Sequence, residues 1–132
     1  MKRILICFIG FFITVSVIGQ DTLKTAAAKP KILYGTASFY SNKFNGRKTA
    51  NGEIYSHEKM TAACNVLPLG TWIRVTNLRN SRSVVVKTND RLHNRMKRVV
   101  DLTRSAAQKL SYLKSGVTRV KVEVLGKKKP EK

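Results

Sequence analysis

Few carboxyl groups in this chain could carry out acid–base chemistry. The segment from residue 34 to residue 125 contains five of them, which are Glu53, Glu58, Asp90, Asp101 and Glu123. Glu123 lies on the polar side of an alternating stretch and Glu58 lies in a polar turn, so we expect both to be solvated. The other three are the candidates for transferring a proton to or from a substrate.

Asp90 stands at the end of an apolar run, in the stretch VVVKTND at residues 84–90. A carboxylate at the point where a strand leaves the core is held on rigid backbone and is partly shielded from water. This placement suits a general acid. The alternative is a turn aspartate that accepts hydrogen bonds from the local backbone. Spacing alone is compatible with both roles.

The other two candidate carboxylates differ in their surroundings. Asp101 comes just before a predicted helix, where it would support the helix N-terminus and pair with a nearby arginine, so we expect a structural role. Glu53 follows Asn51 and Gly52, which form a tight turn that could present its carboxylate to a groove. A solvated turn residue is an equally good interpretation of Glu53.

Neither a metal nor another cofactor is expected. The two histidines lie far apart without the spacing of metal ligands, and the chain has no glycine-rich phosphate loop and no nucleophile elbow. Aromatic residues gather in the first half of the segment, as they do in many sugar-binding grooves. Tyr40 and Phe44 flank polar loop residues and are the candidates for such a groove, whereas Phe39 and Trp72 are expected to pack in the core.

The elements that would position these residues are mostly short strands. Alternation and apolar runs predict strands over residues 34–40, 72–76, 83–88, 98–102 and 117–125, the last with Val117 among its apolar positions. Turn residues at 79–81 join two of the strands into a hairpin. One helix is predicted over residues 105–113, capped by Thr103 and ended by Gly116. One short helix among five or six strands indicates a mainly β protein, a small barrel.

The two ends of the chain differ from its middle. Residues 4–19 form an apolar run behind Lys2 and Arg3, which is typical of a signal peptide at residues 1–19 and too short for a membrane span. We expect a flexible lead at 20–33, one domain at 34–125 and a basic tail at 126–132. A lipid anchor is not expected, because Ile6 precedes Cys7 where a lipobox needs a small residue.

Export changes what the positive charge means. Twenty-six Lys and Arg against seven Asp and Glu give a formal net charge of +19. In the cytoplasm this charge would favour nucleic acid, but outside it the polyanions are wall glycans with acidic stem peptides, surface polymers and lipid head groups. We therefore expect no nucleic-acid partner, and no membrane span after signal cleavage.

An ordered series of motifs runs through residues 34–125. The motifs are GTASFY at 35–40, FNGRKTANGE at 44–53, TAA at 61–63, LPLGT at 67–71, RVTN at 74–77, SVVV at 83–86, NDR at 89–91, VDLT at 100–103 and VKVEV at 120–124. In this order they resemble the rare lipoprotein A family, RlpA. The resemblance implies a six-stranded double-psi β-barrel with one or two short helices, a fold shared with expansins, barwins and a family of small cellulases.

The resemblance also implies roles for individual residues. Asp90 matches the proposed catalytic acid in the family's Asn-Asp-Arg motif, and Glu53 matches the family's glutamate after Asn-Gly. The residues expected to contact substrate are Tyr40, Phe44, Asn51, Cys64, Asn89 and Arg91. Cys64 stands where the family usually has a histidine that is important for activity, and a thiol is a weak hydrogen-bond donor in place of an imidazole. Leu92 and His93 stand where the family usually has Gly-Pro.

Members of the RlpA family are exported endolytic transglycosylases that act on peptidoglycan and prefer glycan without stem peptides. The resemblance therefore predicts a lytic transglycosylase that cleaves the bond between N-acetylmuramic acid and N-acetylglucosamine and leaves an anhydro-muramyl end. Asp90 would protonate the leaving oxygen while the muramic C6 hydroxyl attacks, so no second carboxylate is needed to activate water. Glu53 would position the sugar or tune Asp90.

One alternative is a non-catalytic, expansin-like barrel that binds wall glycan, and the Cys64 substitution favours it. A basic toxin or nucleic-acid binder would need only charge, and no motif in the series supports either. In both leading interpretations the partner is a peptidoglycan glycan strand. We expect a monomer that is exported to the periplasm or cell envelope, or secreted.

Overall fold

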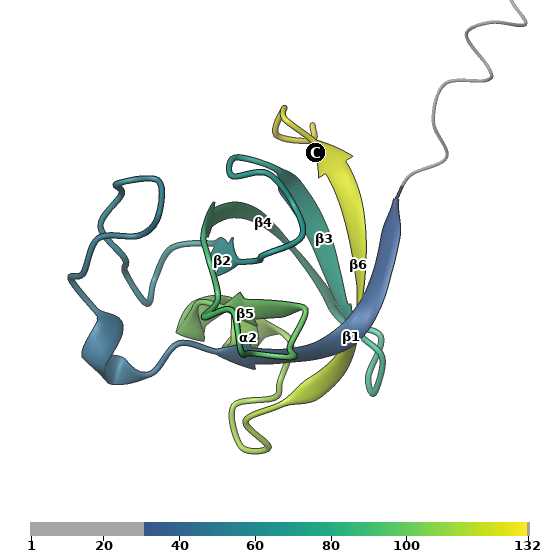
Figure 1. Cartoon of the computed structure of the whole chain (residues 1–132). Helices are drawn as coiled ribbons and strands as arrows, with labels where there is room; N and C mark the ends of the chain where they lie inside the picture. Colours follow the sequence, from purple (N-terminus) through teal and green to yellow (C-terminus); the bar gives the residue numbers. More distant parts are fainter. Residues whose placement is uncertain (1–30, 132) are drawn as a thin grey trace, which may run out of the picture.

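Six strands close into a barrel in the order β1-β5-β2-β4-β3-β6 in the computed structural model (Figure 1). The elements are β1 (Ile32–Phe39), the short 3-10 helix η1 (Asn42–Phe44), β2 (Thr61–Ala63), β3 (Trp72–Asn77), β4 (Ser83–Asp90), β5 (Val100–Leu102), the helix α2 (Arg104–Lys109) and β6 (Thr118–Gly126). The structure describes residues 31–131, so the predicted signal peptide and the predicted lead as far as residue 30 lie outside them. The prediction of a mainly β, six-stranded barrel is confirmed.

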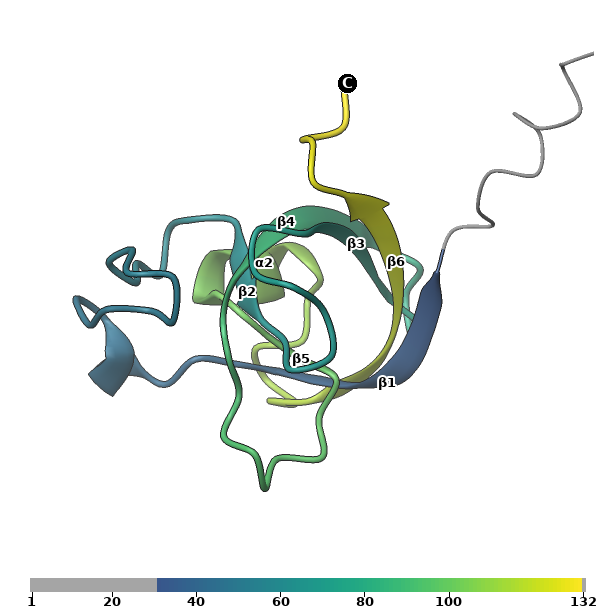
Figure 2. The same cartoon turned by 45° about the horizontal axis from the view of Figure 1, so that its top comes forward.

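The chain crosses over itself where two pairs of strands run parallel. β1 pairs with β5 and β2 with β4 in parallel, while the other four pairings are antiparallel. β3 and β4 form the predicted hairpin, and Ser81 in its turn has a positive φ of 63°. Figure 2 shows the resulting ring, with the long segment between β1 and β2 extending to one side. As a result, β2 lies between β4 and β5, two strands that follow it in the sequence.

Alternating residues of the long strands fill the barrel. The inward members, none more than 7% exposed, are Ile73, Val75, Val84, Val86, Val120 and Val122. Trp72 shares the outward parity of Arg74 and is half-buried on the barrel wall, so its predicted place in the core is wrong. Phe39 does pack against the core, with its ring centroid 5.9 Å from that of Tyr112. Val117 is 48% exposed and precedes β6, so this strand begins one residue later than predicted.

The helix α2 begins at the predicted cap but ends early. The Thr103 hydroxyl accepts a hydrogen bond from the backbone N–H of Ala106. The helix stops at Lys109 rather than at 113, because Ser111 adopts a positive φ of 60° that a right-handed helix does not contain. Ala106 and Ala107 are the buried residues of the helix. Within residues 31–131, no helix has the length and apolar character to cross a membrane.

Candidate active site

The end of β4 places Asp90 beside the short strand β2. Ala63 of β2 pairs with Asp90 on one side and with Asp101 of β5 on the other. Neighbouring strands lie about 4.8 Å apart, so about 10 Å separates the two aspartate backbones across Ala63. The methyl group of Ala63 is small, and it leaves the space between the two carboxylates open.

A groove of about 670 Å³ opens over this end of the barrel. The side chains around it include Tyr40, Phe44, Asp90, Leu92, Arg98 and Asp101. Of the residues predicted from the sequence to act on substrate, the groove brings together Asp90, Tyr40, Phe44 and Arg91. Aromatic faces beside a few converging polar groups are the ordinary composition of a site for a small polar ligand such as a sugar.

Hydrogen bonds orient both carboxylate oxygens of Asp90. Oδ1 accepts from the backbone N–H groups of Ala50 at 2.9 Å and Arg91 at 2.8 Å, and Oδ2 accepts from the Tyr40 hydroxyl at 2.6 Å. The bond from Arg91 is the local contact of a turn aspartate, whereas the other two donors lie 40 and 50 residues away in the sequence. An ionised carboxylate offers about four acceptor positions. One position on Oδ2 is therefore left for a ligand in the groove.

A cluster of aromatic rings holds the Tyr40 hydroxyl on Asp90. The Tyr40 ring stacks on Tyr55 at a centroid distance of 4.1 Å and meets the edge of Phe44 at 5.8 Å. Burial, reinforced by the bond to Asp90, raises the pKa of Tyr40 well above its usual range, so its phenol stays a donor. The Tyr55 hydroxyl lies 2.9 Å from His57 Nδ1, and burial raises the pKa of Tyr55 to about 12.

Glu53 lies behind the groove rather than in its wall. Its Oε2 accepts from Asn89 Nδ2 at 3.2 Å and its Oε1 from Asn51 Nδ2 at 2.7 Å, and these two bonds lower the pKa of Glu53. Asn89 is only 1% exposed, so its side chain supports Glu53 and does not face the groove. The backbone N–H of Asn51 donates to the Asn89 carbonyl at 3.2 Å. This bond ties the turn at 51–53 to the residue preceding Asp90.

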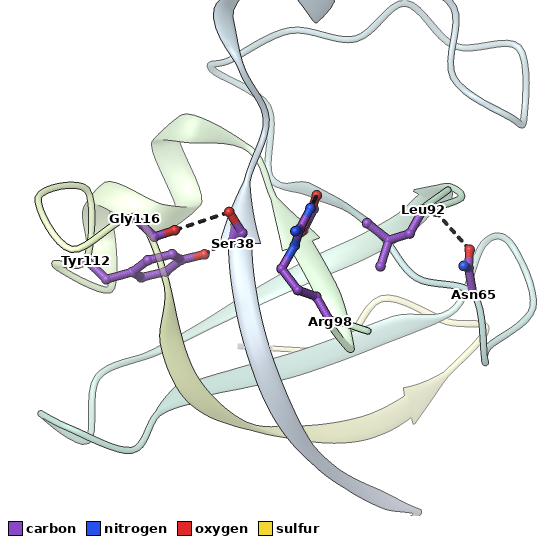
Figure 3. A network of polar contacts seen from close by, with 7 residues as sticks. Ser38, Asn65, Leu92, Arg98, Tyr112 and Gly116 are labelled. Carbon is purple, nitrogen blue, oxygen red and sulfur yellow. Dashed lines mark hydrogen bonds and ion pairs between the residues drawn. The ribbon is translucent and has the colours of Figure 1, made fainter. Parts of the chain in front are cut away.

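Two predicted contact residues lie elsewhere or act differently. Cys64 is fully buried in the core cluster, so its side chain does not line the groove, and its backbone N–H donates to the Asp90 carbonyl at 3.0 Å. The Arg91 guanidinium donates to the carbonyls of Cys64 and Leu67, the latter at 2.5 Å. The backbone N–H of Leu92 donates to Asn65 Oδ1 at 2.8 Å (Figure 3). These contacts fasten the loop after β2 to the loop after β4.

Arg98 is a groove residue that the sequence did not single out. Its guanidinium donates to both carboxylate oxygens of Asp101, at 2.8 and 3.0 Å, and these bonds raise the pKa of Arg98. The predicted pairing of Asp101 with a nearby arginine is thus confirmed. Nearby, the Tyr112 hydroxyl donates to the Ser38 carbonyl at 2.8 Å and the Ser38 hydroxyl donates to the Gly116 carbonyl at 3.1 Å. These two bonds steady the end of β1 just before Tyr40.

A metal centre is not evident in the part of the chain that the structure describes. No group of three or more His, Cys, Asp or Glu side chains lies together there as metal ligands would. Asp90 and Asp101 share the groove, but Asp101 is already neutralised by Arg98. The groove therefore presents one carboxylate without a cationic side-chain partner, and that carboxylate is Asp90.

Comparison with protein families identifies this barrel. A family model described as lytic transglycolase matches residues 33–122. This chain belongs to the lytic transglycolase family. The double-psi β-barrel and the resemblance to RlpA, both predicted from the motif series, are confirmed.

The relatives of this chain are longer proteins. The chain is 47% identical over 108 residues to the endolytic peptidoglycan transglycosylase RlpA of Pseudomonas aeruginosa strain UCBPP-PA14. The matched residues are 82% of this chain and 32% of that protein. The chain is 50% identical over 91 residues to the RlpA of Pasteurella multocida, covering 69% of this chain and 31% of that protein. This chain therefore spans about a third of the length of these relatives.

A solved structure shows how widely the fold is shared. The apo form of the Clavibacter michiganensis expansin superposes on this chain with a TM-score of 0.59. The two are 18% identical, over 77% of this chain and 53% of the expansin. At this level of identity the likeness concerns the fold alone.

Proposed function

We propose that this lytic transglycolase domain cleaves the bond between N-acetylmuramic acid and N-acetylglucosamine in peptidoglycan strands. The observation that carries the proposal is the Asp90 carboxylate, which three donors orient at the groove with one position of Oδ2 left over. The relatives named as endolytic peptidoglycan transglycosylases support the reaction class. Stem-peptide-poor glycan is the form of substrate we expect the groove to favour.

The reaction needs one group that gives a proton and then takes one back. Protonated Asp90 donates from Oδ2 to the glycosidic oxygen as the bond to the muramic C1 breaks and positive charge develops on that ring. The C6 hydroxyl of the same sugar attacks C1, closes the 1,6-anhydro ring and returns its proton to Oδ2. No water is consumed. A tethered hydroxyl also has a large advantage in effective concentration over a free nucleophile.

The residues around Asp90 divide into those that touch the sugar and those that position the acid. Phe44 offers an aromatic face in the groove, and the Tyr40 hydroxyl fixes the orientation of Oδ2. Glu53 acts as a positioning residue, because its bonds to Asn51 and Asn89 order the turn next to Ala50, whose N–H holds Oδ1. In this assignment Glu53 needs no contact with substrate.

The test is a digest of purified peptidoglycan, both intact and stripped of stem peptides, with the products analysed by mass spectrometry. We expect the wild-type chain to release fragments with anhydro-muramyl ends. Asp90→Asn keeps the size and the backbone contacts of the side chain, and it should abolish release without loss of the folded state. Glu58→Gln makes the same chemical change at an exposed carboxylate and should cut normally. Activity retained in Asp90→Asn refutes the assignment.

A second candidate is a barrel that binds wall glycan without cutting it. The observation in its favour is Cys64, which replaces the histidine implied by the RlpA resemblance and is fully buried in the core. The same digest separates the two candidates. A chain that stays on the glycan and releases nothing from either substrate is a binding barrel, and Asp90 is then a contact residue.

The setting of the domain belongs to the proposal as well. We infer that residues 34–125 act as a monomeric domain outside the cytoplasm, after cleavage of a signal peptide at residues 1–19. Removal of Lys2 and Arg3 with the signal peptide lowers the formal net charge from +19 to +17, and this charge would concentrate the protein on the anionic polymers of the cell envelope. N-terminal sequencing of the exported chain tests the cleavage, and a mature chain that still begins at Met1 contradicts it.

A further inference from the structure

A second cavity lies on the outer wall of the barrel and shares no residue with the groove. Its volume is about 900 Å³. Around it stand Lys59, Trp72, Arg74, Val85, Lys109 and Lys129. Strands β3 and β4 supply the floor, and the chain after β6 supplies one side. The cavity thus joins an aromatic ring, an aliphatic floor and a group of cations.

Trp72 gives this cavity a flat apolar face. The strand parity points the indole away from the core, so that it lies half-buried on the outer wall. Lys129 lies over the ring, with its ammonium 5.7 Å from the ring centroid. The face of an aromatic ring is electron-rich, so it attracts the C–H groups on the flat face of a pyranose as it attracts a cation. The indole is therefore a platform on which a sugar ring can displace the Lys129 ammonium.

The charges around the cavity select the kind of sugar. Four cationic side chains, Lys59, Arg74, Lys109 and Lys129, surround it, and Glu131 is the only acidic side chain in its lining. Three of the four cations are lysines without an ion-pair partner among the described residues, while Arg74 lies 3.9 Å from Glu123. Such a field attracts anions. A neutral sugar can only stack on the indole, whereas a sugar that carries a carboxylate can stack on the indole and also form ion pairs with the cations.

We propose that this cavity is a second, non-catalytic binding site for carboxylated glycan, in which Trp72 stacks on a sugar ring and the surrounding cations bind its carboxylate. The class of polymer rests on the proposed function. Val85 of this cavity and Asp90 of the groove lie five residues apart on β4, which corresponds to about 16 Å along an extended strand. One glycan strand of several sugars can therefore reach both sites, so the cavity holds the polymer while the groove acts on it.

The sequence offers a direct probe, because Trp72 is the only tryptophan in the chain. The experiment titrates the Asp90→Asn variant with muramyl oligosaccharides and follows tryptophan emission, so that no cleavage occurs during the measurement. We expect a saturable change in emission that weakens as salt is raised. Neutral chito-oligosaccharides of the same length should bind more weakly. Emission that stays constant while the variant still sediments with glycan overturns the proposal.

Variants of the cavity separate binding from folding. Lys129→Gln should weaken binding about two- to fivefold, the range expected for the loss of one exposed cation that pairs with the sugar carboxylate. Lys114→Gln makes the same change at an exposed lysine that does not line this cavity and should bind as the wild type does. Trp72→Tyr should retain sedimentation with glycan that Trp72→Ala loses, with both variants folded by circular dichroism. Equal binding by all four variants refutes the site.

The outcomes also keep this proposal distinct from the proposed function. If the wild-type chain releases no anhydro-muramyl fragments but its tryptophan emission responds to muramyl oligosaccharides, the catalytic assignment fails and the second site stands. If Trp72→Ala releases fragments from long glycan at the normal rate, and the tryptophan emission of the Asp90→Asn variant does not respond to muramyl oligosaccharides, the second site fails and the catalytic assignment stands.

Discussion

Removing a single oxygen atom from Tyr40 tests how the groove orients its acid. In Tyr40→Phe the ring still stacks on Tyr55 and still meets the edge of Phe44, because neither contact uses the hydroxyl. The only hydrogen bond lost is the 2.6 Å bond to Asp90 Oδ2. Oδ2 is the oxygen that we assign to proton transfer, and it then has no protein donor to fix its direction.

The size of the effect follows from the kind of bond. A hydrogen bond to a charged group contributes about 1.5–3 kcal/mol, and about 1.4 kcal/mol in the activation barrier changes a rate tenfold. If the bond acts in the transition state, kcat should fall about 10- to 100-fold. KM should change little, because the aromatic face of the groove remains in place.

The assay is the initial rate of release of anhydro-muramyl fragments over a range of glycan concentrations. Tyr55→Phe is the matched control, since it removes a hydroxyl one ring further from Asp90 that lies 2.9 Å from His57 Nδ1 and has no hydrogen bond to Asp90. We expect Tyr55→Phe to stay within a few-fold of the wild type. A Tyr40→Phe rate within twofold of the wild type, or a loss confined to KM, refutes the role assigned to the Tyr40 hydroxyl.

Three further perturbations follow from buried or paired groups. Cys64→Ser buries a hydroxyl in the apolar core and should lower the free energy of unfolding by about 1–3 kcal/mol in urea titrations; in the native chain a thiol reagent should leave Cys64 unlabelled, as peptide mapping can show. Arg98→Gln leaves the Asp101 carboxylate without its ion pair and should lower Tm in calorimetry, and adding Asp101→Asn should recover much of the loss. Burial raises the pKa of Tyr112, so the contribution of this phenol to stability is complete below about pH 10 and is lost as the pH rises further. Above that pH the free energy of unfolding should fall by about 1.4 kcal/mol per pH unit because of this group. Tyr112→Phe should show a shallower decline of stability at alkaline pH.

Local patterns in the sequence predicted the parts of the fold that local forces decide. The alternation in β3, β4 and β6, the hairpin turn and the Thr103 cap all follow from residues close together in the chain. β2 was not predicted from the sequence, because its three residues are all buried and therefore show no alternation of polar and apolar residues. Trp72 lies on the outer wall instead of in the predicted core because it shares the outward strand parity of Arg74, and this parity outweighs its hydrophobic character.

The candidate site was predictable only in part, for a topological reason. Asp90 could be found as a carboxylate at the end of an apolar run, and its local bond from Arg91 could be expected. Its neighbours across Ala63 could not, because β2 lies between β4 and β5 only through the crossed pairing of the barrel. The inward burial of Cys64 likewise depends on which way the end of β2 faces, which three buried residues do not reveal.

The pairing of the first strand with the last sets the order in which this molecule can fold. β1 lies against β6 over a register from Ile32 opposite Glu123 to Ala37 opposite Thr118, so the ring closes only when segments about ninety residues apart meet. Proteins dominated by such long-range contacts have high contact order and fold slowly, in about milliseconds to seconds. A chain released without β6 leaves the edges of β1 and β3 unpaired, and unpaired edges invite aggregation. The ring of strands can therefore close only after the nine-residue strand β6 has been synthesised.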